Sequence, residues 1–511
     1  MVLFTFSPPP NAGERSKNAT VSKGFYHIKI VQGRGELLER IDKLRSILSS
    51  KGKTIHFVGI GGSGMFPIAK IINSQGFKVT GSDIYESDTL GKIRELGIDV
   101  ALDHKPENIK NCDALVYSAA IKTSNPEIAE AQSRNIPVIE RCELLGLISE
   151  KYDNFIGVSG THGKTTTTSI ITHILLDANK NPSAIIGGTL KKLNGNSCEG
   201  SSDIFVCEAC EYVDSFLQLY PKFTVILNLE ADHLDYFKTF ENMKKSFKKF
   251  AFQTKDTIIY NGDDSNIIEI LNDIDKNKIS FGFSENNDYV TENILMDKNG
   301  STTFDLTLNG KLLGKISLNI PGKHNIYNAV AGIIVCLNLG VEFEDIKRHI
   351  LGFKGAHRRF EILGNPGGIL IVDDFAHHPT EIKSTLVTAK NMKFNKIWAI
   401  FQPHTYSRTF MFLDDFAKAL SIADEVILTE ILPVRETNIY DIYSKDLAAK
   451  MRNCICIDDF DKIAEFILNN ARKGDIVITM GGGNIYKCAN IILGKLTAVS
   501  FEKRHMSKCP L

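Results

Sequence analysis

The sequence predicts an α/β protein of three domains: an N-terminal Rossmann-like domain, a central domain with a parallel sheet like those of P-loop ATPases, and a C-terminal Rossmann-like domain. Short apolar runs of strand length alternate with helical patterns over most of the chain, which is typical of parallel sheets. Two of the predicted strands lead into glycine-rich turns, which commonly hold phosphate groups in such sheets. A chain of 511 residues is long enough for about three domains.

Changes in composition and pattern divide the chain into five segments. Residues 1–52 form an extension that we expect to be partly disordered, although positions 36–48 have an amphipathic helical pattern. The other segments are the first domain (53–150), the central domain (151–355), the C-terminal domain (356–495) and a polar tail (496–511).

The first domain contains a glycine turn that predicts a diphosphate site. Its predicted strands are 54–58, 78–81, 114–118 and 137–139. A G-x-G-x-x-G turn follows the first strand and includes Gly59, Gly61, Gly62, Ser63 and Gly64, and Asp83 lies near the end of the second strand. This combination often binds a dinucleotide, but its physics requires only a diphosphate near a helix N-terminus. NAD and a nucleotide sugar both remain open on these residues alone.

The central domain carries the strongest signal, a phosphate-binding loop between the apolar run 155–158 and a helical pattern through 170–175. Backbone N–H groups close around phosphate oxygens, Lys164 neutralises their charge, and the Thr165 hydroxyl can hold Mg²⁺. The loop is a variant, because position 158 is valine where the usual pattern has glycine. It predicts ATP or GTP binding by Gly160, Thr161, His162, Gly163, Lys164, Thr165 and Thr166.

Two further strands of the central domain, at 204–206 and 223–229, are followed by polar residues at the expected carboxyl edge of the sheet. Glu208 follows the first strand and His233 the second. With Thr165 they offer carboxylate, imidazole and hydroxyl ligands, a set that can hold one or two divalent cations beside a nucleotide's phosphates. Patterns around 304–308 and 315–320 predict a small antiparallel addition.

Side chains suited to a nucleotide and a carboxylate continue downstream. Asn325 and Asn328 share one helical face, where amides can read an adenine edge or simply cap the helix. The C-terminal domain has predicted strands at 369–372, 396–401, 425–429 and 475–479. An arginine pair at its start, Arg358 and Arg359, can reach a phosphate, and Arg408 lies in a second cationic loop suited to a carboxylate.

Bulk composition excludes several classes of partner. Lysine plus arginine and aspartate plus glutamate number 60 each, so no global field favours nucleic acid or an anionic membrane. Ten cysteines are too few for a disulfide framework, and no run approaches the length of a membrane span. We therefore expect a cytoplasmic protein without stable membrane insertion. The lone C-x-x-C at 207–210 lacks a partner pair for zinc, and the apolar run 454–457 predicts a buried strand.

Seven motifs in one order give residues 53–495 a family resemblance. They are the glycine-rich turns 59–65 and 160–166, Glu-Ala-Cys-Glu-Tyr at 208–212, Asp-His at 232–233, His-Asn-Ile-Tyr-Asn-Ala at 324–329, Arg-Arg-Phe-Glu at 358–361 and Asp-Asp-Phe-Ala-His-His-Pro at 373–379. These motifs resemble the Mur ligases, in particular the members that add L-alanine to UDP-N-acetylmuramate. The resemblance implies a three-domain, ATP-dependent carboxylate–amine ligase of peptidoglycan precursor synthesis.

The resemblance also implies a role for each motif. Lys164, Glu208, His233 and Arg359 would be catalytic, and Thr165, Glu208 and His233 would serve Mg²⁺. Asn325 and Asn328 would contact adenine, while Arg359 and Asp374 would complete the ATP site when the C-terminal domain closes. The turn from Gly59 to Gly64, with Asp83, would face the UDP moiety. His378 and Arg408 would contact L-alanine.

The sequence departs from the family pattern near the amino-acid pocket. Phe375 stands where tyrosine is common, and Thr405 where arginine is frequent. Lys248 lies where other Mur ligases carry a carbamylated lysine, a feature that alanine-adding members generally lack, so we leave it out of the site.

Three rival functions remain on the residues alone, and the oligomeric state stays open. A recycling ligase would join a murein peptide to the same sugar nucleotide through a similar ATP site. An NAD-dependent oxidoreductase would use the first glycine turn, and a nucleotide-switched binding module would use the phosphate loop.

Overall fold

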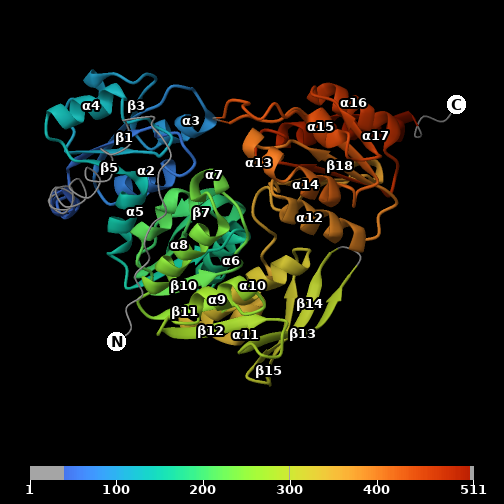
Figure 1. Ribbon diagram of the computed structural model, residues 1–511, viewed down its shortest axis with the longest axis horizontal. Coiled ribbons are helices and arrows are strands. Elements are labelled where there is room, and N and C mark those ends of the chain that lie inside the picture. The colour runs from blue at the N-terminus through green and yellow to red at the C-terminus, as the bar shows by residue number, and fades with distance from the viewer. Residues whose placement is uncertain (1–39, 298–299, 435, 507–511) are drawn as a thin grey trace, which may run out of the picture. The chain divides into compact units, whose positions relative to one another are not determined.

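The computed structural model describes residues 40–297, 300–434 and 436–506 (Figure 1). It divides the chain into two compact units, with the boundary after Glu140, and each unit is described here by itself. The described residues form sheets of five, ten and six strands with helices between them, which confirms the predicted α/β class. The domain boundaries expected from the sequence remain predictions, as does disorder in the extension, most of which lies outside the described residues.

The first unit is a Rossmann-like sheet preceded by a helix over residues 40–48. Its five strands are all parallel, in the order β3-β2-β1-β4-β5. The elements are β1 (Thr54–Val58), α2 (Phe66–Ser74), β2 (Lys78–Ser82), α3 (Asp88–Glu95), β3 (Asp99–Ala101), β4 (Ala114–Tyr117), α4 (Pro126–Ser133) and β5 (Val138–Glu140). The four strands predicted from the sequence are therefore confirmed to within a residue or so at their ends.

The central part of the second unit is built on a ten-stranded sheet, in the order β15-β14-β13-β12-β11-β10-β6-β9-β7-β8. Its strands are β6 (Asn154–Ser159), β7 (Ser183–Leu190), β8 (Gly195–Cys198), β9 (Ile204–Glu208), β10 (Phe223–Ile226), β11 (Thr257–Asn261), β12 (Asn277–Gly282), β13 (Tyr289–Met296), β14 (Thr302–Leu308) and β15 (Lys311–Leu318). Strands from β12 to β7 run parallel, and β14 and β15 form the predicted antiparallel addition.

Helices cover this sheet and fix the position of the phosphate loop. They are α5 (Arg141–Ser149), α6 (Lys164–Asp177), α7 (Leu234–Phe237), α8 (Phe240–Phe252), α9 (Ser265–Leu271), α10 (Lys323–Asn338) and α11 (Phe343–Leu351). The buried isoleucines of α6 and the apolar side of α10 share one core with the sheet. Because β6 lies between β9 and β10, the polar residues that follow these strands gather at one edge.

The C-terminal part of the second unit has a six-stranded sheet, in the order β16-β17-β21-β18-β19-β20. Its elements are β16 (Glu361–Gly364), β17 (Leu370–Asp374), α12 (Pro379–Asn391), β18 (Ile397–Phe401), α13 (Tyr406–Met411), α14 (Leu413–Leu420), β19 (Glu425–Leu428), α15 (Ser444–Ala448), β20 (Cys454–Cys456), α16 (Phe460–Asn470), β21 (Ile476–Met480) and α17 (Tyr486–Met506). Helices α12 and α14 pack on one face, and α16 and α17 pack on the other (Figure 1).

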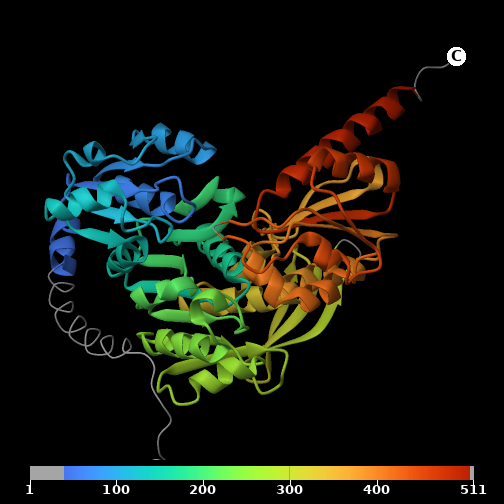
Figure 2. The ribbon, with the colours of Figure 1, turned by 45° about the horizontal axis from the view of Figure 1, so that its top comes forward.

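Two local expectations differ from the structure. The run 454–457 was expected to be a buried strand, but β20 is the edge strand of its sheet, and Cys456 is exposed. A short apolar run does not reveal whether a strand has neighbours on one side or both. Helix α17 also continues to Met506, through most of the segment expected as a polar tail (Figure 2). Lysine and glutamate are good helix formers, so polarity alone does not end a helix.

The described residues contain no helix with the length and apolar character needed to cross a membrane.

Candidate active site

The predicted phosphate loop connects the end of β6 to the start of α6. Gly163, with φ of 86°, precedes the helix in a left-handed conformation that favours glycine. A Cβ at this position would lie 2.3 Å from Asn328 Oδ1, so the loop and α10 approach too closely for any other residue. Asn228 holds the loop from the other side, since its Oδ1 accepts from His162 N–H at 2.8 Å.

A cavity of about 210 Å³ opens beside this loop, between the central sheet and α12. Seven residues predicted to bind ATP line it together: His162, Gly163, Thr166, Asn325, Asn328, Arg359 and Asp374. Residues that the sequence analysis did not select also line it, among them Asn228, Glu230, His324 and Glu381. Segments separated by more than 150 residues in the chain therefore meet around one cavity.

The phosphate-loop lysine is turned toward the protein. Lys164 Nζ donates to Gly160 O at 2.5 Å and Thr161 O at 3.1 Å, and it lies 2.9 Å from Glu211 Oε2. Burial alone would lower the pKa of Lys164, but the Glu211 carboxylate raises it above its usual range. The lysine is therefore charged and already has an anionic partner.

Two of the three predicted metal ligands lie together at the sheet edge. Thr165 Oγ1 donates to Glu208 Oε2 at 2.9 Å, and Gly187 N–H donates to the same carboxylate oxygen at 2.9 Å. A Cβ at Gly187 would lie 2.1 Å from that oxygen, so this glycine forms a cradle for Glu208. The contacts of His233 are with other residues: its ring lies against Tyr212, with centroids 4.8 Å apart, and its Nε2 lies 3.8 Å from Asp232 Oδ2.

The two neighbouring arginines have different partners. Arg358 is buried; its Nε donates to Asp373 Oδ2 at 2.7 Å, and its other nitrogens donate to the carbonyls of Gly481 and Gly483 at 2.8 Å. Arg359 points to the phosphate loop, where its guanidinium donates to Thr165 Oγ1 at 3.3 Å. Of the two arginines, only Arg359 therefore lines the cavity.

Asp374 is held in place at the end of β17. Its carboxylate accepts from Phe360 N–H at 2.8 Å and Ala376 N–H at 2.7 Å. Burial raises the pKa of Asp374 to about 6, and the nearby Arg359 charge limits the rise. Near neutral pH the Asp374 carboxyl group is ionised in most molecules, although burial disfavours its charged form.

Arg408 lies in a second buried cluster. Its guanidinium donates to Asp232 Oδ1 at 3.0 Å and lies 3.4 Å from His404 Nδ1. His377 packs against His404, with ring centroids 5.5 Å apart. Burial lowers the pKa of His377 to about 4 and of His404 to about 3, so both rings are neutral at physiological pH.

His378, predicted to act with Arg408, faces a different group of residues. Its ring contacts His162 and Phe412, with centroids 4.9 Å and 5.0 Å away. The ring nearer the Arg408 cluster is that of His377. The structure thus brings His377 and His404 next to Arg408, although neither was among the predicted site residues. In the sequence, only their place in motifs pointed to them.

The glycine turn of the first unit is closed by hydrogen bonds to the end of β2 and to Asp83. Gly59 and Ile60 N–H groups donate to Ser82 O at 2.8 Å and 3.1 Å, which closes the turn over the end of β2. Asp83 Oδ2 accepts from Gly61 N–H at 3.0 Å. Asp83 therefore touches the turn itself, while Gly62, Ser63 and Gly64 lead into α2.

Lys248, left out of the site, lies on α8. Its side chain is 43% exposed and forms an ion pair with Asp273, with Nζ 2.6 Å from Oδ1.

Comparison with known proteins gives a family match in three consecutive parts. Residues 54–153 match the Mur ligase family catalytic domain, 158–336 match the Mur ligase middle domain, and 358–483 match the Mur ligase glutamate ligase domain. The chain therefore belongs to the Mur ligase family. It is an ATP-dependent ligase, which confirms the class of enzyme that the motifs implied.

Two curated relatives match over nearly their whole length. The UDP-N-acetylmuramate–L-alanine ligase of Acetivibrio thermocellus is 44% identical over 460 residues, or 89% of this chain and 98% of the relative. The protein of the same name from Caldicellulosiruptor saccharolyticus is 46% identical over 445 residues, or 86% and 98%.

Solved structures agree with this match. The UDP-N-acetylmuramate–alanine ligase of Thermotoga maritima aligns with a TM-score of 0.75 at 28% identity, over 87% of this chain and 99% of that one. A murein peptide ligase from Psychrobacter arcticus aligns with a TM-score of 0.66 at 25% identity, over 87% and 99%.

Proposed function

We propose that this protein joins L-alanine to the carboxylate of UDP-N-acetylmuramate, driven by ATP cleavage, in the synthesis of peptidoglycan precursors. One observation carries the proposal: a relative named for this reaction is 44% identical over 98% of its own length. Among the solved structures, the alanine ligase aligns with a TM-score of 0.75 at 28% identity, and the murein peptide ligase, which represents the nearest rival function, with 0.66 at 25%.

The reaction requires activation of the acid. A carboxylate does not react with an amine at neutral pH, because its oxygen is a poor leaving group. Transfer of the γ-phosphoryl group of ATP to the carboxylate forms an acyl phosphate and ADP. The amine of alanine then attacks the acyl carbon, the amide bond forms, and phosphate leaves while the amine loses its proton. Such transfer depends on positioning and charge neutralisation, which suits a site rich in cations.

We assign ATP to the cavity beside the phosphate loop. Gly160, Thr161, Gly163 and Thr166 would surround the phosphates with Lys164, while Asn325 and Asn328 would contact adenine. Asn325 Oδ1 accepts from Asn328 at 3.0 Å, so the two amides orient each other. Arg359 and Asp374 reach the same cavity from the C-terminal part of the unit.

The pair Thr165 and Glu208 fits a magnesium ion. Mg²⁺ prefers hard oxygen ligands, and here a hydroxyl and a carboxylate oxygen lie 2.9 Å apart beside the phosphate loop. The cradle at Gly187 fixes the carboxylate in place. When bound, the ion would neutralise phosphate charge, and His233 would serve it as the third residue of the predicted set.

For the other substrates we assign Arg408 to L-alanine and the glycine turn with Asp83 to the UDP moiety. The alanine carboxylate would then compete with Asp232 for Arg408. The protein would act in the cytoplasm, where ATP and nucleotide sugars are made.

Phosphate release provides the test. The protein is incubated with ATP, Mg²⁺ and UDP-N-acetylmuramate, together with single amino acids or short murein peptides. We expect release that depends on L-alanine. Dependence on a peptide instead would favour the recycling ligase, and ATP binding with no amine-dependent turnover would favour a nucleotide-switched module. An NAD-dependent oxidoreductase would instead produce a nicotinamide absorbance change, and it would leave the phosphate loop without a role.

A further inference from the structure

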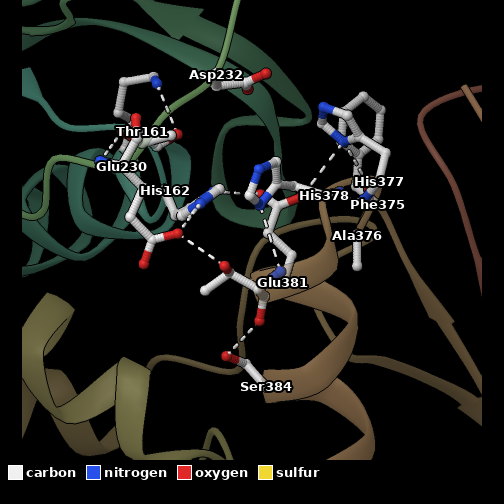
Figure 3. Close-up of polar contacts among 12 residues, drawn as sticks. Thr161, His162, Glu230, Asp232, Phe375, Ala376, His377, His378, Glu381 and Ser384 are labelled. Carbon is white, nitrogen blue, oxygen red and sulfur yellow. Dashed lines mark hydrogen bonds and ion pairs between the residues drawn. The ribbon is translucent and has the colours of Figure 1, made fainter. Parts of the chain in front are cut away.

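Three side chains meet at the edge of the nucleotide cavity (Figure 3). The proposed reaction gives them no common role. His162 belongs to the phosphate loop, Glu230 follows β10, and His378 precedes α12. A ligand-capable atom of each lies within 4.8 Å of those of the other two. A small shift would bring all three to the separation of ligands around one ion.

A carboxylate already orients His162 as a metal ligand. Its Nδ1 lies 3.2 Å from Glu381 Oε1, and its Nε2 lies 3.3 Å from Glu230 Oε2 (Figure 3). Metal-bound histidines usually donate their second ring N–H to such a carboxylate, which fixes the ring and raises its basicity. Glu381 would supply this outer contact, leaving Nε2 to face the ion.

The imidazole of His378 is buried and incompletely bonded. The residue is 5% exposed, and its Nε2 has no hydrogen-bond partner among the described residues. Its Nδ1 accepts a long hydrogen bond from Thr380 N–H, at 3.3 Å. Burial and then the His162 charge lower the pKa of His378, so the ring is neutral and a lone pair is available. Ligation through Nε2 would move the ring proton to Nδ1 and replace that long bond.

We propose that His162, Glu230 and His378 form a second cation site, for a transition metal such as Zn²⁺. Two imidazole nitrogens and one carboxylate oxygen are the donor set of many zinc sites, with positions left for water. Mg²⁺ prefers oxygen ligands and would favour Thr165 and Glu208 instead. The two sites share no ligand.

Two cavities give an ion access to this cluster. The nucleotide cavity is lined by His162 and Glu230, and a neighbouring cavity of about 590 Å³ is lined by Glu230 and His378. Glu230 and Thr380 line both, and Thr380 Oγ1 donates to Glu230 Oε2 at 2.7 Å. The carboxylate is therefore oriented at the junction of the two openings.

A bound ion would replace a proton and join two parts of the unit. Burial alone would lower the pKa of His162, but the Glu230 and Glu381 carboxylates raise it to about 9, so the metal-free ring is an imidazolium. Metal binding would release that proton to solvent. The ion would then link the phosphate loop to the start of α12, and thus hold the nucleotide cavity in one arrangement.

Titration with Co²⁺ tests the site by spectroscopy, without an activity assay. The untagged full chain is treated with chelator, and Co²⁺ is added without Mg²⁺. We expect one equivalent to produce the visible band of a low-coordinate nitrogen and oxygen site, and Zn²⁺ to abolish it. His378→Asn keeps an acceptor for the helix cap but removes the imidazole, so binding should weaken more than about tenfold. Glu381→Gln, which alters the outer contact and keeps an amide oxygen for the His377 and His378 N–H groups, should weaken binding about tenfold.

Two matched variants identify the ligands. Glu208→Gln removes the proposed magnesium carboxylate, and His357→Asn removes an exposed histidine whose Nδ1 lies 2.6 Å from Glu361. Both should keep the Co²⁺ band, and thermal melting should show that all variants fold. The proposal is overturned if no band forms, if His378→Asn binds as tightly as the unmodified protein, or if Glu208→Gln alone abolishes the band.

Discussion

Lys164 and Glu211 form a buried ion pair at the base of the phosphate loop, with Nζ 2.9 Å from Oε2 and side chains 12% and 1% exposed. We propose that Lys164 binds the nucleotide, and in the structure its ammonium group is already paired with the Glu211 carboxylate. Nucleotide binding must therefore exchange one anionic partner of Lys164 for another.

We expect Glu211→Gln to lower the free energy of unfolding by roughly 1.5–3 kcal/mol, because a hydrogen bond between charged groups is lost and a buried ammonium is left without its counter-charge. Phosphates can supply that charge. The increase in melting temperature on adding ATP should thus be larger in the variant than in the unmodified protein. Equal ATP-induced shifts would contradict the exchange.

Lys164→Ala should reduce kcat by more than about a hundredfold, since loss of one preorganised donor costs at least about 3 kcal/mol of transition-state stabilisation. Steady-state phosphate release measures this effect. Lys248→Ala serves as the control, because Lys248 is exposed and paired only with Asp273 in the structure. It should retain near-normal turnover, and a comparable loss there would revive the carbamylated-lysine alternative.

Gly187→Ala should reduce activity about tenfold or more and raise the Mg²⁺ concentration needed for half-maximal rate. The added methyl group would lie 2.1 Å from Glu208 Oε2, so the carboxylate must move away from Thr165. Gly195→Ala is the matched control, since its nearest neighbour would be 3.8 Å away. An unchanged Mg²⁺ dependence in Gly187→Ala would remove Glu208 from the proposed ion site.

The pKa of His162 predicts a pH dependence of stability in chelator-treated protein. The folded-state pKa of about 9 exceeds the unfolded value of 6.5, so the stabilisation is full below pH 6.5 and is lost as pH rises to about 9. The loss is at most about 3 kcal/mol, at about 1.4 kcal/mol per pKa unit. Denaturant unfolding at several pH values should show this decline, and His162→Gln should flatten it.

Arg408→Lys should raise the KM for L-alanine by about tenfold while the KM for ATP stays unchanged. Lysine keeps the charge and can still pair with Asp232, but it lacks the planar fork that binds a carboxylate with two hydrogen bonds. Initial rates at varied alanine and varied ATP separate the two constants. An effect on ATP alone would move Arg408 out of the amino-acid pocket.

Local pattern was sufficient for most of the fold. Alternating strand and helix patterns identified the strands that carry site residues, because buried parallel strands are short and almost wholly apolar. The same pattern failed at Ile455, which is 40% exposed on an edge strand, since strand order depends on contacts distant in sequence. It also failed where α17 continues into a charged segment.

Candidate site residues could be selected where motifs are local, and less readily where the candidate site depends on tertiary contacts. The phosphate loop and the pair Asn325 and Asn328 were recognisable because their spacing carries the chemistry. Glu230 and Glu381 gave no signal, since an acidic residue at a strand or helix end is common, and Glu211 was noted only as part of the 208–212 motif. Their significance comes from which histidine or lysine lies opposite them in the folded chain.

The contacts of Arg358 connect the neighbouring Arg359 to the C-terminal sheet. Arg358 is bonded to Asp373 on β17 and to two carbonyls of the turn after β21, so the backbone at Arg359 is tied to the C-terminal sheet. A rotation of that sheet would carry the Arg359 guanidinium toward or away from Thr165. If ATP binds as we propose, the orientation of the C-terminal sheet would set how close this positive charge lies to the phosphates.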